Sequence, residues 1–137
     1  MATTYFVRKS GSDANSGLSA ALAKLTIQAA INLATTAGDT VYVGAGSYRE
    51  KVTLAASGSA GNVISVIGDY DGTQTGDAGV VRITGSNNDQ TATRSNCVVG
   101  SSKNYVTITG FTFDMASSHT MTLASCTNIT VSKCSFN

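Results

Sequence analysis

Two stretches of sequence decide the fold, YVTITGFTF at residues 105–113 and NITVSKCSF at residues 128–136. Laid over each other, they match with an offset of 23 residues throughout. The matched apolar pairs are Val106 with Ile129, Ile108 with Val131, Phe111 with Cys134, and Phe113 with Phe136. A self-similar period built from strands indicates a solenoid, in which each repeat packs on the next.

The alternation inside each repeat predicts which solenoid forms. Val106 and Ile108 face one way in the pleat. Residues 109–110 then interrupt the strand with a sharp bend, after which Phe111 and Phe113 continue the same apolar face. A coil of three short strands and their turns takes about 20 to 25 residues. We therefore predict an all-β solenoid, a right-handed parallel β-helix with about 23 residues per coil.

Stacked coils should place equivalent side chains in ladders about 4.8 Å apart. The 23-residue step leads back from Val106 to Ile83, and from Ile64 and Val66 to Val41 and Val43. We expect an inward ladder of Ile83, Val106 and Ile129, and an outward ladder of Thr107 and Thr130. A leucine-rich repeat would need an asparagine and leucine spacing that is absent here. An ordinary β-sandwich is the stronger alternative, but it would not explain the fixed offset.

The composition fits many short strands joined by turns in a single domain of 137 residues. The chain holds 19 Thr, 17 Ser, 14 Gly and nine Asn, with no Pro and no Trp. Nine Lys and Arg against eight Asp and Glu, scattered along the chain, argue against a nucleic-acid partner, which needs a clustered basic excess. No apolar run approaches the ~18 residues of a membrane span, and no signal peptide is visible.

Residues 18–37 carry the one helical pattern, and we expect this helix to cap the N-terminal end of the solenoid. Thr26 is the predicted N-cap, and Gly38 stops the helix. The predicted apolar face consists of Leu22, Leu25, Ala29 and Leu33, extended by Ile27, Ala30, Ile31 and Ala34. The single domain then comprises an N-terminal strand, a loop and the capping helix over residues 1–37, and about four coils over residues 38–137.

Three motifs suggest chemistry but lack part of what that chemistry needs. Residues 69–73 (DYDGT) with Asp77 resemble a calcium loop, but the glycine comes too early and no Glu stands at the twelfth position. A turn is therefore favoured over a weak calcium site. Residues 44–46 (GAG) lack the third glycine and the helix of a dinucleotide site. The single histidine, His119, has no Ser and Asp placed to form a triad with it.

The remaining charged and sulfur-bearing residues are too scattered to form a site. The charged residues of the better-defined coils that could serve polysaccharide chemistry are Asp89, Arg94, Lys103 and Asp114. One coil after Asp114 stands Asn137, so no carboxylate ladder forms. The three cysteines have neither zinc nor disulfide spacing and are expected as small apolar core residues: Cys97, Cys126 and Cys134. We assign no catalytic, cofactor-binding or metal-binding residue, and we expect no enzyme activity within residues 1–137.

The first half of the chain carries a series of short motifs, YFV at 5–7, GSD at 11–13, NSG at 15–17, TIQ at 26–28, AI at 30–31, AGDTVYV at 37–43 and GSYRE at 46–50. Together they resemble the N-terminal part of right-handed parallel β-helix proteins of the pectate-lyase-like superfamily, including bacteriophage tailspike and tail-fibre members. Ala45 and Val63 stand where the family pattern usually has Pro. The resemblance implies the fold and its helical cap. It implies no site residues, because the family's calcium ligands and catalytic base lie in later coils.

The predicted function rests on this context. We expect a virion-associated structural protein: a phage tail fibre, tailspike or capsid-surface appendage. The supporting features are the absence of a signal peptide and of a catalytic constellation, and an uncovered last coil at Phe136 that calls for a partner. The expected partners are other virion proteins or further copies of this chain, a homotrimer by resemblance, with a cell-surface polysaccharide as a glycan ligand. The expected location is the virion, made in the host cytoplasm, and the alternative location is extracellular.

Two other functions stay open. In the first, the chain is the non-catalytic N-terminal portion of a polysaccharide lyase or glycoside hydrolase whose β-helix continues past residue 137. In the second, it is a passive carbohydrate-binding module. The exposed aromatic candidates for such a module are Tyr48, Tyr70 and Tyr105.

Overall fold

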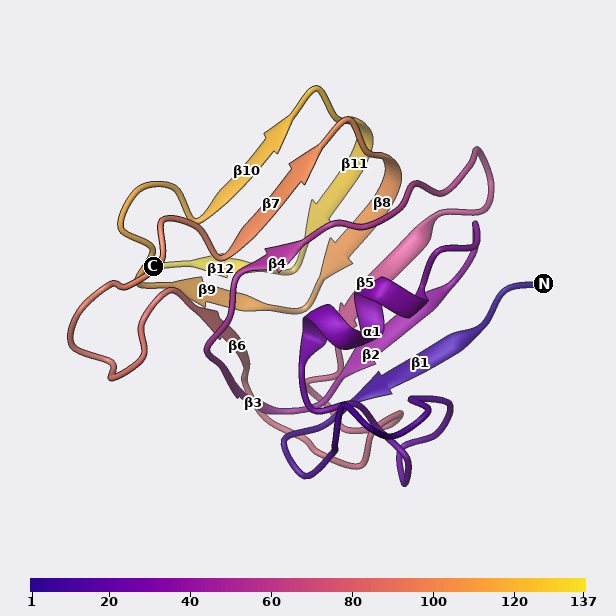
Figure 1. The fold of residues 1–137 in the computed structure, drawn as a ribbon, viewed down its shortest axis with the longest axis horizontal. Coiled ribbons are helices and arrows are strands. Elements are labelled where there is room, and N and C mark those ends of the chain that lie inside the picture. The colour runs from indigo at the N-terminus through magenta and orange to yellow at the C-terminus, as the bar shows by residue number, and fades with distance from the viewer.

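The computed structural model of residues 1–137 consists of three parallel β-sheets and one short helix, α1 (Ile27–Leu33) (Figure 1). Sheet A contains, in spatial order, β1 (Thr4–Val7), β2 (Thr40–Val43), β5 (Ile64–Gly68), β8 (Asn104–Thr109) and β11 (Thr127–Ser132). Sheet B contains β3 (Gly46–Tyr48), β6 (Val81–Thr84), β9 (Thr112–Asp114) and β12 (Ser135–Phe136). Sheet C contains β4 (Val52–Thr53), β7 (Val98–Ser101) and β10 (Met121–Ala124).

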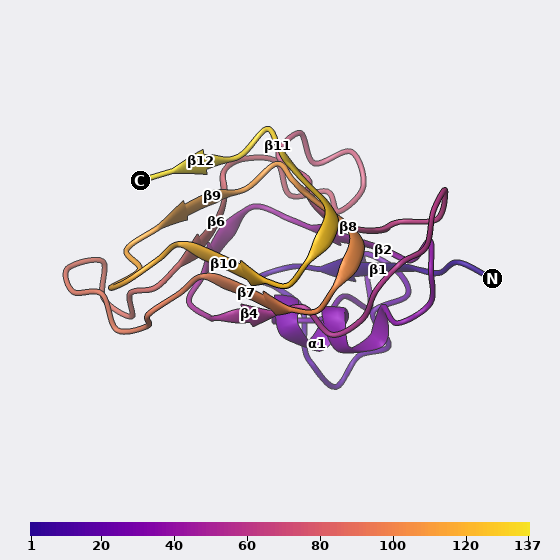
Figure 2. The same ribbon diagram turned by 90° about the horizontal axis from the view of Figure 1, so that it is seen from above.

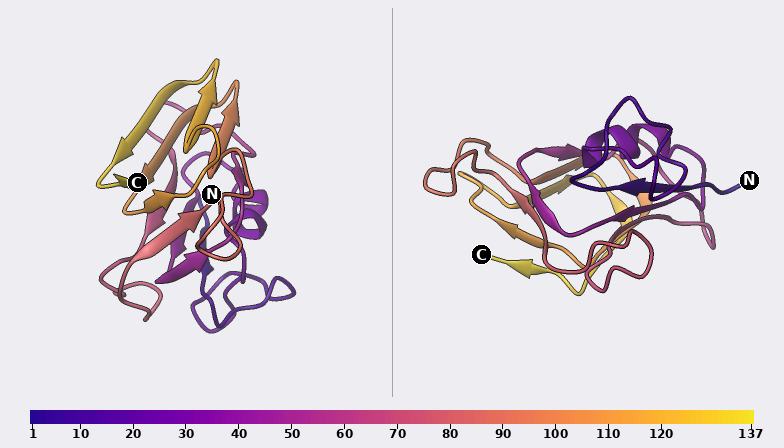
Figure 3. Two further views of the ribbon diagram at one scale, coloured as in Figure 1. Left: turned by 90° about the vertical axis from the view of Figure 1, so that its left-hand side faces the viewer. Right: turned by 90° about the horizontal axis from the view of Figure 1, so that it is seen from below.

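From β2 onward the chain visits sheets A, B and C in fixed rotation, and each pass stacks on the one before (Figure 2). Neighbouring strands in every sheet run parallel. The first pass lies at one end of the stack and the last at the other (Figure 3). The prediction of parallel sheets in a solenoid-like arrangement is confirmed.

The 23-residue offset is confirmed for the last two passes in all three sheets. In sheet A, Val106 pairs with Ile129 and Thr107 with Thr130. The same step joins Phe113 to Phe136 in sheet B and Val98 to Met121 in sheet C.

The offset does not extend to the earlier passes, where three predicted matches are wrong: Val41 with Ile64, Val43 with Val66, and Ile83 with Val106. Val41 pairs with Val66, 25 positions on, and not with Ile64. Ile64 in turn pairs with Val106, 42 positions on. Ile83 belongs to sheet B, where it lies between Tyr48 and Phe113, so it is not part of the Val106 ladder. Loops inserted between strands lengthen the early passes, while strand pairing follows the alternation of inward and outward side chains.

The helix is shorter than predicted at both ends. It ends at Leu33 with Ala34 as its C-cap, so the prediction that it extends to residue 37 and is stopped by Gly38 is wrong. At its start, the backbone is held from outside the helix. The Asp13 carboxylate accepts hydrogen bonds from the backbone N–H of Leu25 and Thr26, both at 2.9 Å, so the chain upstream turns away instead of continuing the helix. Residues 18–26 form turns and a single bridge to β1. Thr26 is the N-cap as predicted, and its hydroxyl oxygen accepts from the N–H of Ala29 at 3.3 Å.

Only part of the predicted apolar stripe faces the core. The buried residues of the predicted stripe are Ile27, Ala30, Ile31 and Ala34, whereas Leu22, Leu25 and Leu33 are exposed, as is Leu18. α1 packs against β1, β2 and β4. The Glu50 carboxylate accepts hydrogen bonds from the N–H groups of Ile27 and Gln28, at 3.1 and 2.9 Å, which satisfies donors that a helix leaves free at its start. None of the chain's helices is long and apolar enough to span a membrane.

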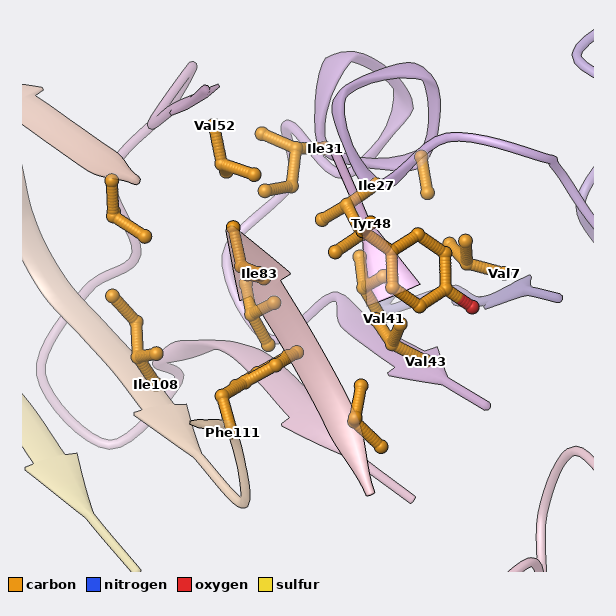
Figure 4. Packing of buried hydrophobic residues seen from close by; sticks show 14 of the residues in the cluster. Val7, Ile27, Ile31, Val41, Val43, Tyr48, Val52, Ile83, Ile108 and Phe111 are labelled. Atoms are coloured by element: carbon orange, nitrogen blue, oxygen red, sulfur yellow. The ribbon is translucent and has the colours of Figure 1, made fainter. Parts of the chain in front are cut away.

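One apolar core fills the space between the three sheets and α1 (Figure 4). The strands alternate, as in β2, where Val41 and Val43 are buried while Thr40 and Tyr42 lie on the outer face. Val131 was expected to be buried, but it is 37% exposed. Since β11 has a neighbouring strand on one side only, its inward side chains are covered from one side only.

Candidate functional site

The loop between β5 and β6, residues 69–80, folds around a buried carboxylate. Asp69 Oδ2 accepts hydrogen bonds from the N–H groups of Gln74 and Thr75, at 3.0 and 2.7 Å, and from the Thr75 hydroxyl at 2.8 Å. Asp69 and Thr75 are both buried. This is the segment that resembles a calcium loop in sequence. Its carboxylates are engaged separately, and no group of three or more His, Cys, Asp or Glu side chains is placed to hold a metal ion.

A bidentate ion pair fastens the loop to the N-terminal strand. Arg8 donates to both carboxylate oxygens of Asp77, from Nε at 2.7 Å and from the terminal nitrogen at 2.8 Å. The hydrogen bonds from Arg8 lower the pKa of Asp77, and the same pairing raises the pKa of Arg8. The loop is thus pre-formed, which spares a ligand the entropy cost of ordering it.

The bend between sheets A and B lacks side chains in two successive coils. The backbones of Gly68 and Gly110 approach so closely that a Cβ on Gly68 would lie 2.3 Å from the Gly110 carbonyl oxygen. Gly110 also has a φ of 84°, which favours glycine. In the next coil the equivalent residue is Lys133, 23 positions on, with a φ of 50°. Gly68, which is buried, and Gly110 therefore let the two backbones pack directly on each other, and Lys133 stands at the equivalent position of the next coil.

A cleft of about 300 Å³ lies over this bend, and we call it the corner cleft. Its floor is formed by Gly68, Gly110 and the outward side chains at the ends of β2, β5 and β8. The β5–β6 loop forms one wall and Lys133 another. The side chains that can contact a ligand are those of Tyr42, Tyr70, Asp71, Gln74, Thr109 and Lys133.

These side chains offer an aromatic face together with hydrogen-bond donors and acceptors. Tyr70 is 55% exposed. Asp71 accepts from the N–H and hydroxyl of Thr73, at 3.1 and 2.9 Å, and the N–H bond lowers the pKa of Asp71, so its carboxylate stays ionised at neutral pH. The Lys133 ammonium and the Gln74 amide form no hydrogen bond or ion pair within the chain, so both are free to bind a ligand.

The three predicted aromatic candidates differ in how exposed they are. Tyr70 is exposed, as expected. Tyr48 is not an exposed aromatic: it is buried in the core, where its hydroxyl donates to the Gly44 carbonyl at 2.9 Å and burial raises its pKa. Tyr105 is half-buried at a left-handed bend and takes no part in the corner cleft.

Asp89 and Asp114 belong to an arginine-carboxylate network on the outer face of sheet B. Arg82 bridges the two, with 2.7 Å contacts to each, and Arg49 donates to Asp89 at 2.7 and 2.8 Å. The hydrogen bonds from Arg49 hold the pKa of Asp89 well below its usual range. Sequence analysis singled out the two carboxylates but missed Arg49 and Arg82. Because Arg49 and Arg82 neutralise these carboxylates, we interpret the network as structural: it holds the loop that follows β6 against sheet B.

The other candidates lie outside any cleft. His119 is exposed, with Nδ1 2.9 Å from the hydroxyl of its neighbour Ser118. Arg94 donates to the carbonyls of Thr84 and Arg49, at 3.3 and 2.7 Å, and Lys103 lies in the turn before β8. Of the cysteines, Cys97 is buried as predicted, and burial raises the pKa of its thiol, whereas Cys126 and Cys134 are half-buried.

Sequence analysis missed most of the corner cleft. Lys133 carries one signal that could have found it, because it replaces Gly110 at the bend when the two repeats are superposed. Tyr42 and Gln74 carry no such signal. They reach the cleft through the pairing of β2 with β5 and through the fold of the 69–80 loop.

In comparisons with known proteins, the chain is similar to several solved structures. No family model and no curated protein matches the chain. XylC, solved in complex with xylose, shares 33% identity over 61% of this chain, with a TM-score of 0.50. The GH136 lacto-N-biosidase from Eubacterium ramulus shares 19% identity over 80% of this chain, with a TM-score of 0.62, and supports the fold alone. The chain spans 12% of the length of the first and 20% of the second. The first of these structures contains bound xylose, and the second is that of a lacto-N-biosidase.

Proposed function

We propose that this chain is a saccharide-binding solenoid segment of a carbohydrate-active protein, and that it binds neutral sugar in the corner cleft. The main support for the proposal is that the exposed ring of Tyr70 and the unpaired ammonium of Lys133 line the same cleft. We take the finer fold to be a right-handed β-helix with α1 as its N-terminal cap. The rotation of strands among three sheets and the packing of α1 on β1, β2 and β4 support that assignment.

The chemistry of the cleft suits a sugar. A pyranose presents an apolar face of C–H groups, which packs on an aromatic ring such as that of Tyr70. Its hydroxyl groups both donate and accept, so Asp71 can accept from them, Lys133 can donate to them, and the Gln74 amide can do both. Few but well-placed polar groups in a pre-formed concave site are typical of small-ligand sites.

We assign binding and no reaction to this cleft. Hydrolysis of a glycosidic bond by most enzymes requires two carboxyl groups flanking the bond. The corner cleft offers one free carboxylate, that of Asp71, because Asp69 is buried and bonded to Thr75. The names of the two relatives favour a carbohydrate ligand. Since each is several times longer than this chain, the activities of those whole proteins say nothing about the cleft.

Titration calorimetry with lactose tests the proposal. We expect a dissociation constant in the millimolar range, and binding weakened about tenfold by Tyr70→Ala, since an aromatic contact is worth about 1 kcal/mol or more. Lys133→Asn should also weaken binding, and Asn tolerates the left-handed conformation there. Lys51→Asn, at an exposed lysine outside the cleft, is the matched control and should bind normally. No binding, or binding unaffected by Tyr70→Ala, would refute the proposal.

The virion-appendage function and its partners and location stay predictions from the sequence.

A further inference from the structure

A second hollow of about 350 Å³ adjoins the corner cleft on the sheet B side of the bend. The two share Tyr70, Gly110 and Lys133. The corner cleft lies over the ends of sheet A strands, whereas the second hollow lies over the starts of β6, β9 and β12. The shared residues therefore divide one groove that runs around the bend into two halves.

The two halves differ in chemistry. The half over sheet A presents Asp71 and Gln74. The half over sheet B has a wall formed by Val80, which is 64% exposed, with Thr112 and Ser135 as its small polar groups. An exposed valine beside two hydroxyl groups suits a ligand group that carries a methyl next to a hydrogen-bonding amide.

Backbone hydrogen bonds hold both walls in place. The Gly79 N–H donates to the Tyr70 carbonyl at 2.8 Å, and the Gly46 N–H donates to the Val80 carbonyl at 2.9 Å. Tyr70 and Val80 are thus positioned relative to each other across the base of the loop and against β3. Both halves are formed before a ligand binds, so a ligand that spans them has no loop to order.

The geometry points to a two-subsite groove for an oligosaccharide with a 2-acetamido sugar, and this assignment rests on the proposed function. One sugar lies in the corner cleft against Tyr70 and Asp71. The acetamido sugar lies over sheet B, with its methyl group on Val80 and its amide near Thr112 and Ser135. The glycosidic linkage crosses the residues that the two halves share, Tyr70, Gly110 and Lys133.

Calorimetry with N-acetyllactosamine and lactose tests this inference, because the two disaccharides differ only in an acetamido group and a hydroxyl. We expect N-acetyllactosamine to bind about three- to fivefold more tightly, as burial of one methyl group would give. Val80→Ser should abolish that preference, so that the two disaccharides bind the variant with similar affinities. Val63→Ser, at another exposed valine outside the groove, should leave both affinities unchanged.

The outcomes separate the two claims. Equal affinities for the two disaccharides, or a preference that survives Val80→Ser, would overturn the second subsite. The proposed function would still stand in that case if lactose binding is weakened by Tyr70→Ala. Absence of binding by either disaccharide would overturn both.

Discussion

Ile108 and Val131 occupy the same inward position in successive coils of sheet A but have different surroundings. Ile108 is 2% exposed, because β8 has β5 on one side and β11 on the other. Val131, in the edge strand, is partly open to water. Since the cost of truncating a side chain depends on how completely it is packed, equivalent positions in this solenoid should not be equivalent in energy.

Ile108→Ala should lower the free energy of unfolding by about 2–5 kcal/mol, since it leaves a cavity in the core. Val131→Ala should cost less than about 1 kcal/mol, because its methyl groups are partly hydrated already. Urea unfolding followed by circular dichroism measures both. Losses of similar size in the two variants would contradict the difference in burial.

At the residue scale, the inward positions of the last two passes could be predicted, and the cleft could not. Val106, Ile108 and Phe113 repeat at a fixed offset, so their alternation alone predicts burial. Tyr70 belongs to a loop with no counterpart in the next coil. Its position beside Lys133 depends on the hydrogen bonds within that loop and on the stacking of distant coils, and periodicity does not report either.

At the scale of elements, α1 shows how a tertiary contact can override a local pattern. The apolar spacing of residues 18–37 is compatible with a longer helix. Asp13 instead takes up backbone donors before the helix begins, and Glu50 takes up those of its first turn. Both carboxylates come from outside the helix. The capping residue Thr26 could therefore be predicted from the sequence, whereas the apolar pattern of residues 18–37 gave too long a helix.

Glu50 makes the stability of this element depend on pH. Burial raises the pKa of Glu50, so the folded chain keeps this proton at pH values where an unfolded carboxyl, with a pKa of about 4.3, has lost it. The folded state then binds more protons, and its stability should fall as the pH rises from about 4 through the raised pKa. Glu50→Gln should remove this slope in unfolding experiments at several pH values. If the stability difference between wild type and variant instead grew with pH, the hydrogen bonds from α1 would outweigh burial.

The ion pair between Arg8 and Asp77 should act in the opposite sense. The pKa of Asp77 is lowered in the folded chain, so its contribution is present above the ordinary carboxyl pKa of about 3.9 and is lost as the pH falls through the lowered value. Asp77→Asn should therefore be slightly less stable than wild type at pH 7, by up to about 1 kcal/mol for a partly exposed pair, and nearly equal to it in strong acid. A stability gap that persists unchanged in strong acid would contradict this.

At the scale of the whole molecule, the first and last strands of the stack differ in what packs on them. α1 packs on the first strands, whereas β10, β11 and β12 are edge strands with free backbone groups on one side. Parallel edges beside exposed apolar side chains promote strand pairing between chains. The period of the last two passes was enough to predict the solenoid, but the lengths of the early passes could not be predicted, because the inserted loops follow no period.

The 137-residue chain should therefore self-associate through these edge strands. We expect light scattering at micromolar concentration to give a mass above the 13.9 kDa of one chain. Val131→Lys should shift the chain toward monomer, because a charge on an edge strand opposes pairing. A soluble, cooperatively melting wild-type monomer would contradict this and weaken the virion-appendage hypothesis.

Backbone amide chemical shifts of the isotope-labelled chain during titration with lactose would report saccharide binding in the corner cleft residue by residue. We expect saturable shifts confined to the groove, at Gly68, residues 70–74, residues 109–112 and Lys133. Amides of α1 and of the arginine network around Arg82 and Asp89 should stay in place and serve as internal controls. Shifts centred on those controls, or no saturable shift at all, would contradict the claim.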